Sequence, residues 1–151
     1  MDLGRIGTAM ITPFKKDGTI NYPELERIIN HLIGNGTDAI IACGTTSENP
    51  TMSTEEKIEV VRFTVEKVAG RVPVIAGTGD NETAYSIMMT HKAEENGADG
   101  IMLVTPYYNK PNQQGMSAHF TTIAKETTLP IMLYNVPGRT GANLLAQTTV
   151  E

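Results

Sequence analysis

The stretch Ile40-Ile-Ala-Cys-Gly-Thr-Thr-Ser-Glu-Asn-Pro50 decides the fold that this sequence predicts. A short apolar run ends at Gly44, two adjacent hydroxyl side chains follow it, and a turn then leads into a helix signal. An apolar strand that ends in small hydroxyl residues and free backbone N–H groups is one way in which α/β folds hold small anionic ligands. The same residues also suit an ordinary strand-to-helix turn. The interpretation therefore depends on whether other strands end in the same way.

The strand-and-helix unit recurs along the whole sequence. Apolar strands are predicted at 6–11, 38–43, 72–76, 99–105 and 129–134, so that successive strands start 27 to 34 residues apart. Each strand is a continuous apolar run rather than an alternating pattern. Both features are typical of a parallel sheet covered by helices.

Helices are predicted between these strands from capping signals and apolar spacing. Asn21 and Ser53 are the expected caps of the first two helices, and Gly34 and Gly97 are expected to end the first and the third. In the second helix the predicted buried stripe is Ile58, Val61, Val65 and Val68. A fourth helix is expected at 116–125. A loop at 135–141 should break the chain before a fifth helix near residue 143.

Two α/β architectures fit this repeat. A doubly wound sheet is complete with five or six strands, whereas a (β/α)8 barrel needs eight strands and about 250 residues. All five strands end in Thr, Gly, Tyr or Asn, as if they opened onto one ligand site, and no Gly-x-Gly-x-x-Gly follows the first strand. We therefore favour a (β/α)8 TIM barrel, truncated here to about five βα units. Residues 1–151 are then the N-terminal part of one barrel domain, ending before the sixth strand.

Composition excludes several classes of function. The net charge is −5 with no Lys/Arg run, which argues against nucleic-acid binding. No apolar run approaches the roughly 20 residues that span a bilayer, and we expect neither a signal peptide nor membrane attachment. His31, His91 and His119 have no metal-ligand spacing, so no metal or other cofactor is expected. The single Cys43 favours a buried structural thiol and a reducing, cytoplasmic location.

Several side chains at the predicted strand ends could carry chemistry. Thr45 and Thr46 follow the second strand, Tyr107 and Tyr108 follow the fourth, and Tyr134 ends the fifth. A packing role is the competing interpretation for one of the two adjacent tyrosines and for Tyr134. In the last loop Pro and Gly residues flank an arginine, Arg139, which could capture a carboxylate with two hydrogen bonds or could simply lie on the surface.

Four motifs in register carry a resemblance to a known family along the whole chain. They are Gly44–Glu48 (Gly-Thr-Thr-Ser-Glu), Gly77-Thr78-Gly79, Thr105–Pro111 (Thr-Pro-Tyr-Tyr-Asn-Lys-Pro) and Tyr134–Gly141 (Tyr-Asn-Val-Pro-Gly-Arg-Thr-Gly). Together they resemble the dihydrodipicolinate synthase family, pyruvate-dependent class I aldolases related to N-acetylneuraminate lyase. The resemblance implies a cytoplasmic (β/α)8 lyase, usually a homotetramer of tight dimers. It condenses pyruvate with L-aspartate 4-semialdehyde through a lysine Schiff base, in diaminopimelate and lysine biosynthesis.

The resemblance also implies a role for each site residue. Tyr134 is similar to the tyrosine that relays protons to and from the Schiff-base intermediates. Thr45 is similar to its hydrogen-bonded partner, and Tyr108 to the tyrosine that completes the relay across a dimer interface. Thr46 is similar to the residue that holds the pyruvate carboxylate, and Arg139 to the arginine that binds the carboxylate of the semialdehyde.

Two departures from the family pattern matter. Ser47 stands where the pattern usually has Gly or another small residue. The Schiff-base lysine belongs to the sixth strand, and none of the seven lysines of this sequence lies in an apolar strand. We therefore expect this chain alone not to catalyse the condensation. Two alternatives stay open: a sugar-acid aldolase such as N-acetylneuraminate lyase, against which Arg139 argues, and a non-catalytic truncated fragment.

Finally, the resemblance implies an effector pocket for lysine. In lysine-sensitive relatives a glutamate on the third helix and histidines near the second helix meet the amino groups of the ligand. By the resemblance, Tyr85 stands in place of the glutamate and Thr54 and Lys57 stand in place of the histidines, while the asparagine of the pocket is kept as Asn81. Because a carboxylate is lost and a like charge is gained, we expect the complete enzyme to be insensitive to L-lysine.

Overall fold

The computed structural model describes residues 2–150 and is built on one five-stranded parallel sheet. The strands are β1 (Gly7–Ala9), β2 (Ala39–Ala42), β3 (Val74–Gly77), β4 (Gly100–Val104) and β5 (Ile131–Tyr134). Each strand pairs with the next one in the chain, so the order is β1-β2-β3-β4-β5. A doubly wound sheet would place later strands on both sides of the first. The sequential order confirms the predicted alternative, a curled half of a (β/α)8 barrel.

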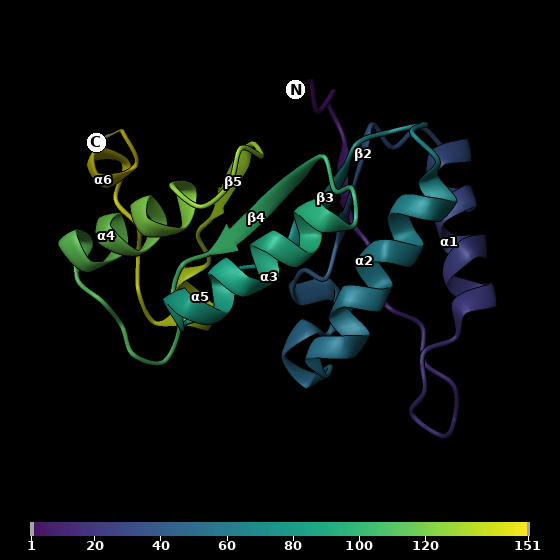
Figure 1. Ribbon diagram of the computed structural model, residues 1–151, viewed down its shortest axis with the longest axis horizontal. Helices are drawn as coiled ribbons and strands as arrows, with labels where there is room; N and C mark the ends of the chain where they lie inside the picture. The colour runs from purple at the N-terminus through teal and green to yellow at the C-terminus, as the bar shows by residue number, and fades with distance from the viewer. Residues whose placement is uncertain (1, 151) are drawn as a thin grey trace.

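Four long helices connect consecutive strands. They are α1 (Tyr22–Gly34), α2 (Thr54–Val68), α3 (Thr83–Glu95) and α4 (Gln113–Ala124). Figure 1 shows them in chain order along one face of the sheet, from α1 in purple-blue at the right to α4 in green at the left. Four short elements lie in the connections: η1 (Thr45–Ser47), η2 (Asn49–Thr51), α5 (Pro137–Thr140) and α6 (Ala146–Thr149).

The predicted starts of α1 and α2 are confirmed. The Asn21 side chain accepts a hydrogen bond from the N–H of Glu24 at 3.3 Å. Ser53 and Glu56 form a reciprocal capping box, in which Ser53 Oγ accepts from the Glu56 N–H at 3.2 Å and Glu56 accepts from the Ser53 N–H at 2.8 Å. Each pair satisfies N–H groups that a helix cannot satisfy internally.

The core has two parts, one on each face of the sheet. The larger part lies between the helices and the sheet and includes the fully buried Leu25, Ile29 and Ile40. The smaller part lies on the opposite, concave face and is built from Ile41, Ile75 and Met102. Successive strand residues point to opposite faces, so burial on both faces explains why the strands are continuously apolar.

The structure corrects the first predicted strand. β1 covers Gly7–Ala9 only, and Ile6 and Ile11 at the ends of the predicted 6–11 strand are 58% and 52% exposed. β1 is an edge strand that pairs with β2 alone. Because no other strand of residues 2–150 pairs with its free side, β1 does not extend further and the residues at its ends stay exposed.

The predicted buried stripe of α2 is also partly wrong. Val61 and Val68 are buried as predicted, but Ile58 and Val65 are only half-buried. The remaining fully buried positions of α2 are Lys57, Val60 and Thr64. Spacings of three and four residues still hold, but the buried face is rotated toward Lys57, whose long side chain reaches past the helix.

The C-terminal connections differ from the prediction in detail. The loop at 135–141 contains the four-residue helix α5, which begins at Pro137, a residue type suited to the first helical turn. The fifth helix expected near residue 143 is the short α6, Ala146–Thr149. The ends of β2 to β5 and of α4 lie within three residues of their predicted limits.

Candidate active site

A cavity of about 320 Å³ opens at the carboxyl ends of β2, β3, β4 and β5. Its walls come from residues of β3, β4 and β5, from the segments that follow β2 to β5, and from the start of α2. The lining residues are Cys43, Gly44, Thr45, Asn49, Pro50, Lys57, Gly77, Gly79, Asp80, Met102, Val104, Tyr107, Tyr134, Val136, Arg139 and Thr140. The sequence suggested that all five strands open onto one site, whereas the segment after β1 contributes none of these residues.

Two glycines let the strand ends approach one another closely enough to form this cavity. A Cβ atom on Gly77 would lie 2.2 Å from the carbonyl oxygen of Cys43, and one on Gly79 would lie 2.4 Å from the nitrogen of Val104. Both neighbours are backbone atoms of adjacent strands, which cannot move aside. The predicted Gly77-Thr78-Gly79 motif therefore has a packing reason in this structure.

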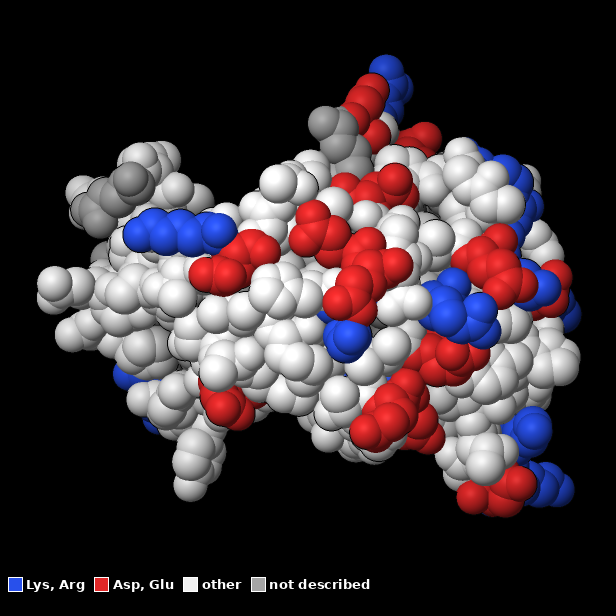
Figure 2. All heavy atoms as spheres, viewed as in Figure 1, with Lys and Arg blue, Asp and Glu red and all other residues white. Residues whose placement is uncertain are grey.

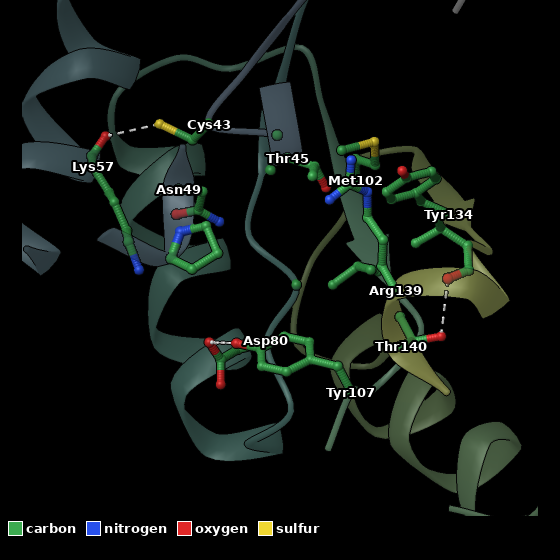
Figure 3. A pocket seen from close by; sticks show the side chains of 16 residues that line it. Cys43, Thr45, Asn49, Lys57, Asp80, Met102, Tyr107, Tyr134, Arg139 and Thr140 are labelled. Carbon is green, nitrogen blue, oxygen red and sulfur yellow. Dashed lines mark hydrogen bonds between the residues drawn. The ribbon is translucent and has the colours of Figure 1, made fainter. Parts of the chain in front are cut away.

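The structure brings three of the predicted site residues together. Tyr134 at the end of β5, Thr45 at the start of η1 and Arg139 on α5 all line the cavity, as Figure 3 shows. Within residues 2–150, no hydrogen bond joins the Tyr134 phenol to Thr45, and no carboxylate pairs with Arg139. These polar groups are therefore available to a ligand.

Arg139 is held in place by the backbone around it. Asn135 donates to the side-chain oxygen of Asn143 at 2.9 Å and accepts from the N–H of Leu144 at 3.1 Å. Thr140, which is buried, donates to the carbonyl of Ala142 at 2.8 Å. These bonds close the loop on itself, so the exposed guanidinium projects from a fixed turn.

The other two predicted site residues do not line the cavity. Thr46 lies in η1 with an exposed side chain. Tyr108 is 90% exposed and has a positive φ of 70°, so its phenol points away from the body of the chain. A positive φ is costly for a residue with a Cβ atom, and neighbouring contacts hold this one in place.

Those contacts come from Asp80, which the sequence did not single out, and from Asn81, which it singled out only for the effector pocket. Tyr107 Oη donates to Asp80 Oδ2 at 2.8 Å, and the Asn81 side chain donates to the Tyr107 carbonyl at 3.1 Å. In return, Asn109 donates to the Asn81 carbonyl at 3.1 Å. Burial, followed by the Asp80 hydrogen bond, raises the pKa of Tyr107 to about 12, so this phenol stays protonated. The only sequence signal was the adjacent tyrosine pair, of which Tyr107 proves to be the packed member.

Lys57 is the second lining residue that sequence reasoning did not place in the site. Its residue exposure is only 8%, and its ammonium reaches the cavity from the first turn of α2. The signal was its spacing of four residues before Val61, on the buried face of α2. Cys43 lies beside it and donates to the Lys57 carbonyl with a sulfur–oxygen distance of 3.6 Å.

The predicted structural role of Cys43 is confirmed. The side chain is 1% exposed, and burial raises the pKa of its thiol to about 12. A thiol with such a pKa is almost wholly protonated near neutral pH and is a poor nucleophile.

Outside the cavity, charged side chains of both signs are spread over the face drawn in Figure 2. On this face, Lys and Arg are scattered among more numerous acidic side chains and form no continuous basic patch. Residues 2–150 hold no group of three or more His, Cys, Asp or Glu side chains that could bind a metal ion. Within the same residues, no helix is both long enough and apolar enough to cross a membrane.

A model of the dihydrodipicolinate synthetase family matches residues 2–151. The chain belongs to this family. The chain is 58% identical to the 4-hydroxy-tetrahydrodipicolinate synthase of Bacillus subtilis (strain 168) over 151 residues. The match covers 100% of this chain and 52% of that protein. This chain thus spans about half the length of the curated relatives it matches.

Solved structures show the same relationship. A dihydrodipicolinate synthase from Bacillus anthracis superposes with a TM-score of 0.98 at 53% identity, covering 99% of this chain and 51% of that one. A dihydrodipicolinate synthase from Cyanidioschyzon merolae with lysine bound gives a TM-score of 0.96 at 48% identity, covering 98% and 51%. The half-barrel of this family member thus corresponds to about half of each solved chain.

Proposed function

We propose that this chain supplies the first five βα units of a (β/α)8 lyase that condenses pyruvate with L-aspartate 4-semialdehyde. The product is 4-hydroxy-tetrahydrodipicolinate, on the route to diaminopimelate and lysine. One observation carries the proposal. Tyr134, Thr45 and Arg139 line one cavity at the carboxyl ends of the strands, where barrel enzymes carry their active sites.

The Schiff-base lysine of this reaction belongs to a sixth strand outside residues 1–151. A condensing lysine must be neutral to attack the keto group of pyruvate, which a desolvated position on a barrel strand favours. The lysines of this chain lie elsewhere. Lys57 is the one that lines the cavity, but it lies on α2, on the side away from Tyr134 and Arg139 (Figure 3). The 151-residue chain therefore does not form the intermediate by itself.

The residues of this chain move protons and hold carboxylates. The Tyr134 phenol passes a proton to and from the Schiff-base intermediates, with the Thr45 hydroxyl as its neighbour. A phenol has an ordinary pKa near 10, so it relays protons near neutral pH only through hydroxyl partners. Tyr108, directed outward, completes the relay in a second copy of the chain. Thr46, which adjoins the lining residue Thr45 in η1 but does not itself line the cavity in this structure, is assigned to the pyruvate carboxylate. Arg139 binds the carboxylate of the semialdehyde.

The complete enzyme acts in the cytoplasm as a homo-oligomer, a dimer of dimers, and uses no cofactor or metal. The exposure of Tyr108 supports the oligomer, because a phenol that is 90% exposed in one chain is available to a neighbouring copy.

The test uses a completed barrel, in which this chain is followed by the part of the Bacillus subtilis relative that lies beyond the matched residues. Pyruvate and borohydride are added, and trapped Schiff base is located by peptide mass spectrometry. We expect an adduct on the completed barrel, on a lysine of the second half, and none on the 151-residue chain. An adduct on Lys57 would overturn the assignment. In the completed barrel, Tyr134→Phe should lower kcat by about 10²-fold or more, the usual contribution of general acid–base catalysis, and leave the adduct in place.

A further inference from the structure

The backbone from Tyr107 to Lys110 forms a strained turn. The Asn109 N–H donates to the Tyr107 carbonyl at 2.8 Å, so Tyr108 is the central residue of a three-residue turn. Tyr108 has a φ of 70°, which is the φ of the rare, strained form of the γ-turn. Lys110 also has a positive φ, of 46°. Because residues with a Cβ atom avoid positive φ, contacts from outside the turn must hold this conformation.

The segment before α3 holds the turn from both ends. At its start, Tyr107 Oη donates to Asp80 Oδ2 at 2.8 Å, and the Asn81 side chain donates to the Tyr107 carbonyl at 3.1 Å. At its end, the Asn109 side chain donates to the Asn81 carbonyl at 3.1 Å. The bond to the Asp80 carboxylate is the shortest of the three. It is also the one with a charged acceptor, which makes a hydrogen bond stronger.

Asp80 is itself fixed at the start of α3. Its Oδ1 accepts from the N–H of Glu82 at 3.1 Å, and its own N–H donates to Ser86 Oγ at 2.9 Å. Ser86 lies in the first turn of α3 and is 0% exposed. The partial positive charge of a helix N-terminus favours a carboxylate at this position. One oxygen of Asp80 thus fixes the carboxylate at α3, and the other is left to hold Tyr107.

The direction of the Tyr108 phenol depends on this hold. The side chain is 90% exposed, so packing within this chain does not fix it, and the backbone of the turn decides where it points. Release of Tyr107 would remove a constraint that keeps the φ of Tyr108 positive, and the turn would relax toward the negative φ that such residues prefer. The phenol would then leave its outward direction.

We propose that Asp80 is a positioning residue of the lyase: through Tyr107 it holds the turn that directs the Tyr108 phenol to a neighbouring copy. The inference rests on the proposed role of Tyr108 in the proton relay. Asp80 lines the cavity, but both of its carboxylate oxygens are bound by the protein, so it acts through Tyr107 rather than on a substrate. Misplacing a catalytic group by about 1 Å can lower a rate by about 10²-fold.

The test is a double-mutant cycle in the completed barrel. Asp80→Ala should lower kcat about tenfold or more and leave KM for both substrates within about twofold of the parent value, because the carboxylate-binding residues are unchanged. In a Tyr108→Phe background the same substitution should change kcat by less than about twofold, since no phenol is left to position. An equal loss in both backgrounds, or no loss in the parent, would overturn the proposal.

Three further variants separate positioning from a general effect on the fold. Tyr107→Phe removes the same hydrogen bond, keeps the ring, and should reproduce the loss of kcat; it replaces Asp80→Ala in the cycle if that variant does not fold. Asp80→Asn should keep most of kcat, because its amide N–H can donate to the phenol oxygen while Oδ1 still accepts from Glu82. Glu82→Ala removes an exposed carboxylate near the same helix end and should leave kcat unchanged. A loss in Glu82→Ala equal to that in Asp80→Ala would assign the effect to charge and refute positioning.

Hydrogen exchange of residues 107–110, followed by mass spectrometry on the completed barrel, measures the hold without catalysis. These amides should exchange faster than in the parent in Asp80→Ala and Tyr107→Phe, and at the parent rate in Asp80→Asn. Parent-like exchange in Asp80→Ala would overturn the proposal even if kcat falls. A completed barrel without turnover would instead refute the lyase function, and the exchange rates would still decide whether Asp80 holds the turn.

Discussion

Gly79→Ala should destabilise the fold at the floor of the cavity. The added Cβ would lie 2.4 Å from the nitrogen of Val104 and 2.8 Å from Cα of Leu103, both backbone atoms of β4. To reach ordinary contact, the segment after β3 and β4 must separate by roughly 1 Å, since non-bonded heavy atoms pack at about 3.5–4.0 Å. That separation breaks the two hydrogen bonds that Met102 O accepts, from Thr78 N at 3.1 Å and from Gly79 N at 3.2 Å.

The expected cost is about 2–3 kcal/mol, because each net hydrogen bond contributes about 1 kcal/mol and a buried acceptor is left unsatisfied. The assay is urea unfolding of the completed barrel, followed by circular dichroism. With a slope of about 2–3 kcal/mol/M, the midpoint should fall by about 1 M. Gly138→Ala is the matched control, because a Cβ there meets nothing within 4 Å, and its stability should stay within about 0.5 kcal/mol of the parent. Equal midpoints for the two variants would refute the close approach of β3 and β4.

Three further predictions concern pH, the departure at residue 47 and feedback. His119 is 7% exposed, and burial lowers the pKa of its imidazole. The contribution of His119 to stability is therefore complete above the unfolded pKa of about 6.5 and is lost as the pH falls below that value. In His119→Gln the urea midpoint should depend less on pH between 7 and 5 than in the parent, and an unchanged dependence would contradict this cause. Ser47 is 1% exposed and donates to the Met10 carbonyl at 2.6 Å, so Ser47→Ala should cost about 1–2 kcal/mol in the same unfolding assay, and a neutral result would show that the bond adds nothing. L-lysine at millimolar concentration should not inhibit the completed barrel in steady-state assays, because Lys57 and Tyr85 stand where a carboxylate is needed; inhibition below 1 mM would show that the matching of these positions is wrong.

The sequence predicted the architecture well because its signals are local and repeated. Continuous apolar strands, the Ser53 capping box and glycines at helix ends each act within a few residues, and their regular spacing indicated a barrel. The prediction of the first strand was wrong for a physical reason that is not local. Ile6 and Ile11 suit a strand, but β1 has a neighbour on one side only, so its ends are not covered.

The candidate site could be predicted where a residue lies at a strand end or in a loop with a clear turn signal. Tyr134 and Thr45 were found at the ends of strands, and Arg139 was found from the Pro and Gly residues that flank it in the last loop. Lys57 was not predicted to line the cavity, because a lysine among apolar helix residues indicates an exposed position. Only the packing of α2 on the sheet shows that its long side chain reaches the cavity. The Asp80–Tyr107 bond joins loops that are 27 residues apart in sequence, and no sequence pattern predicts that pairing.

The most direct test of the central claim is the substrate specificity of the completed barrel. Given pyruvate, the completed barrel should consume L-aspartate 4-semialdehyde and form 4-hydroxy-tetrahydrodipicolinate. It should not turn over pyruvate with N-acetylmannosamine. Arg139→Met should raise KM for the semialdehyde by about tenfold or more, the effect of a lost charge-assisted contact, and leave pyruvate trapping by borohydride intact. A folded barrel that turns over N-acetylmannosamine instead, or that turns over neither aldehyde while still trapping pyruvate, would contradict the account.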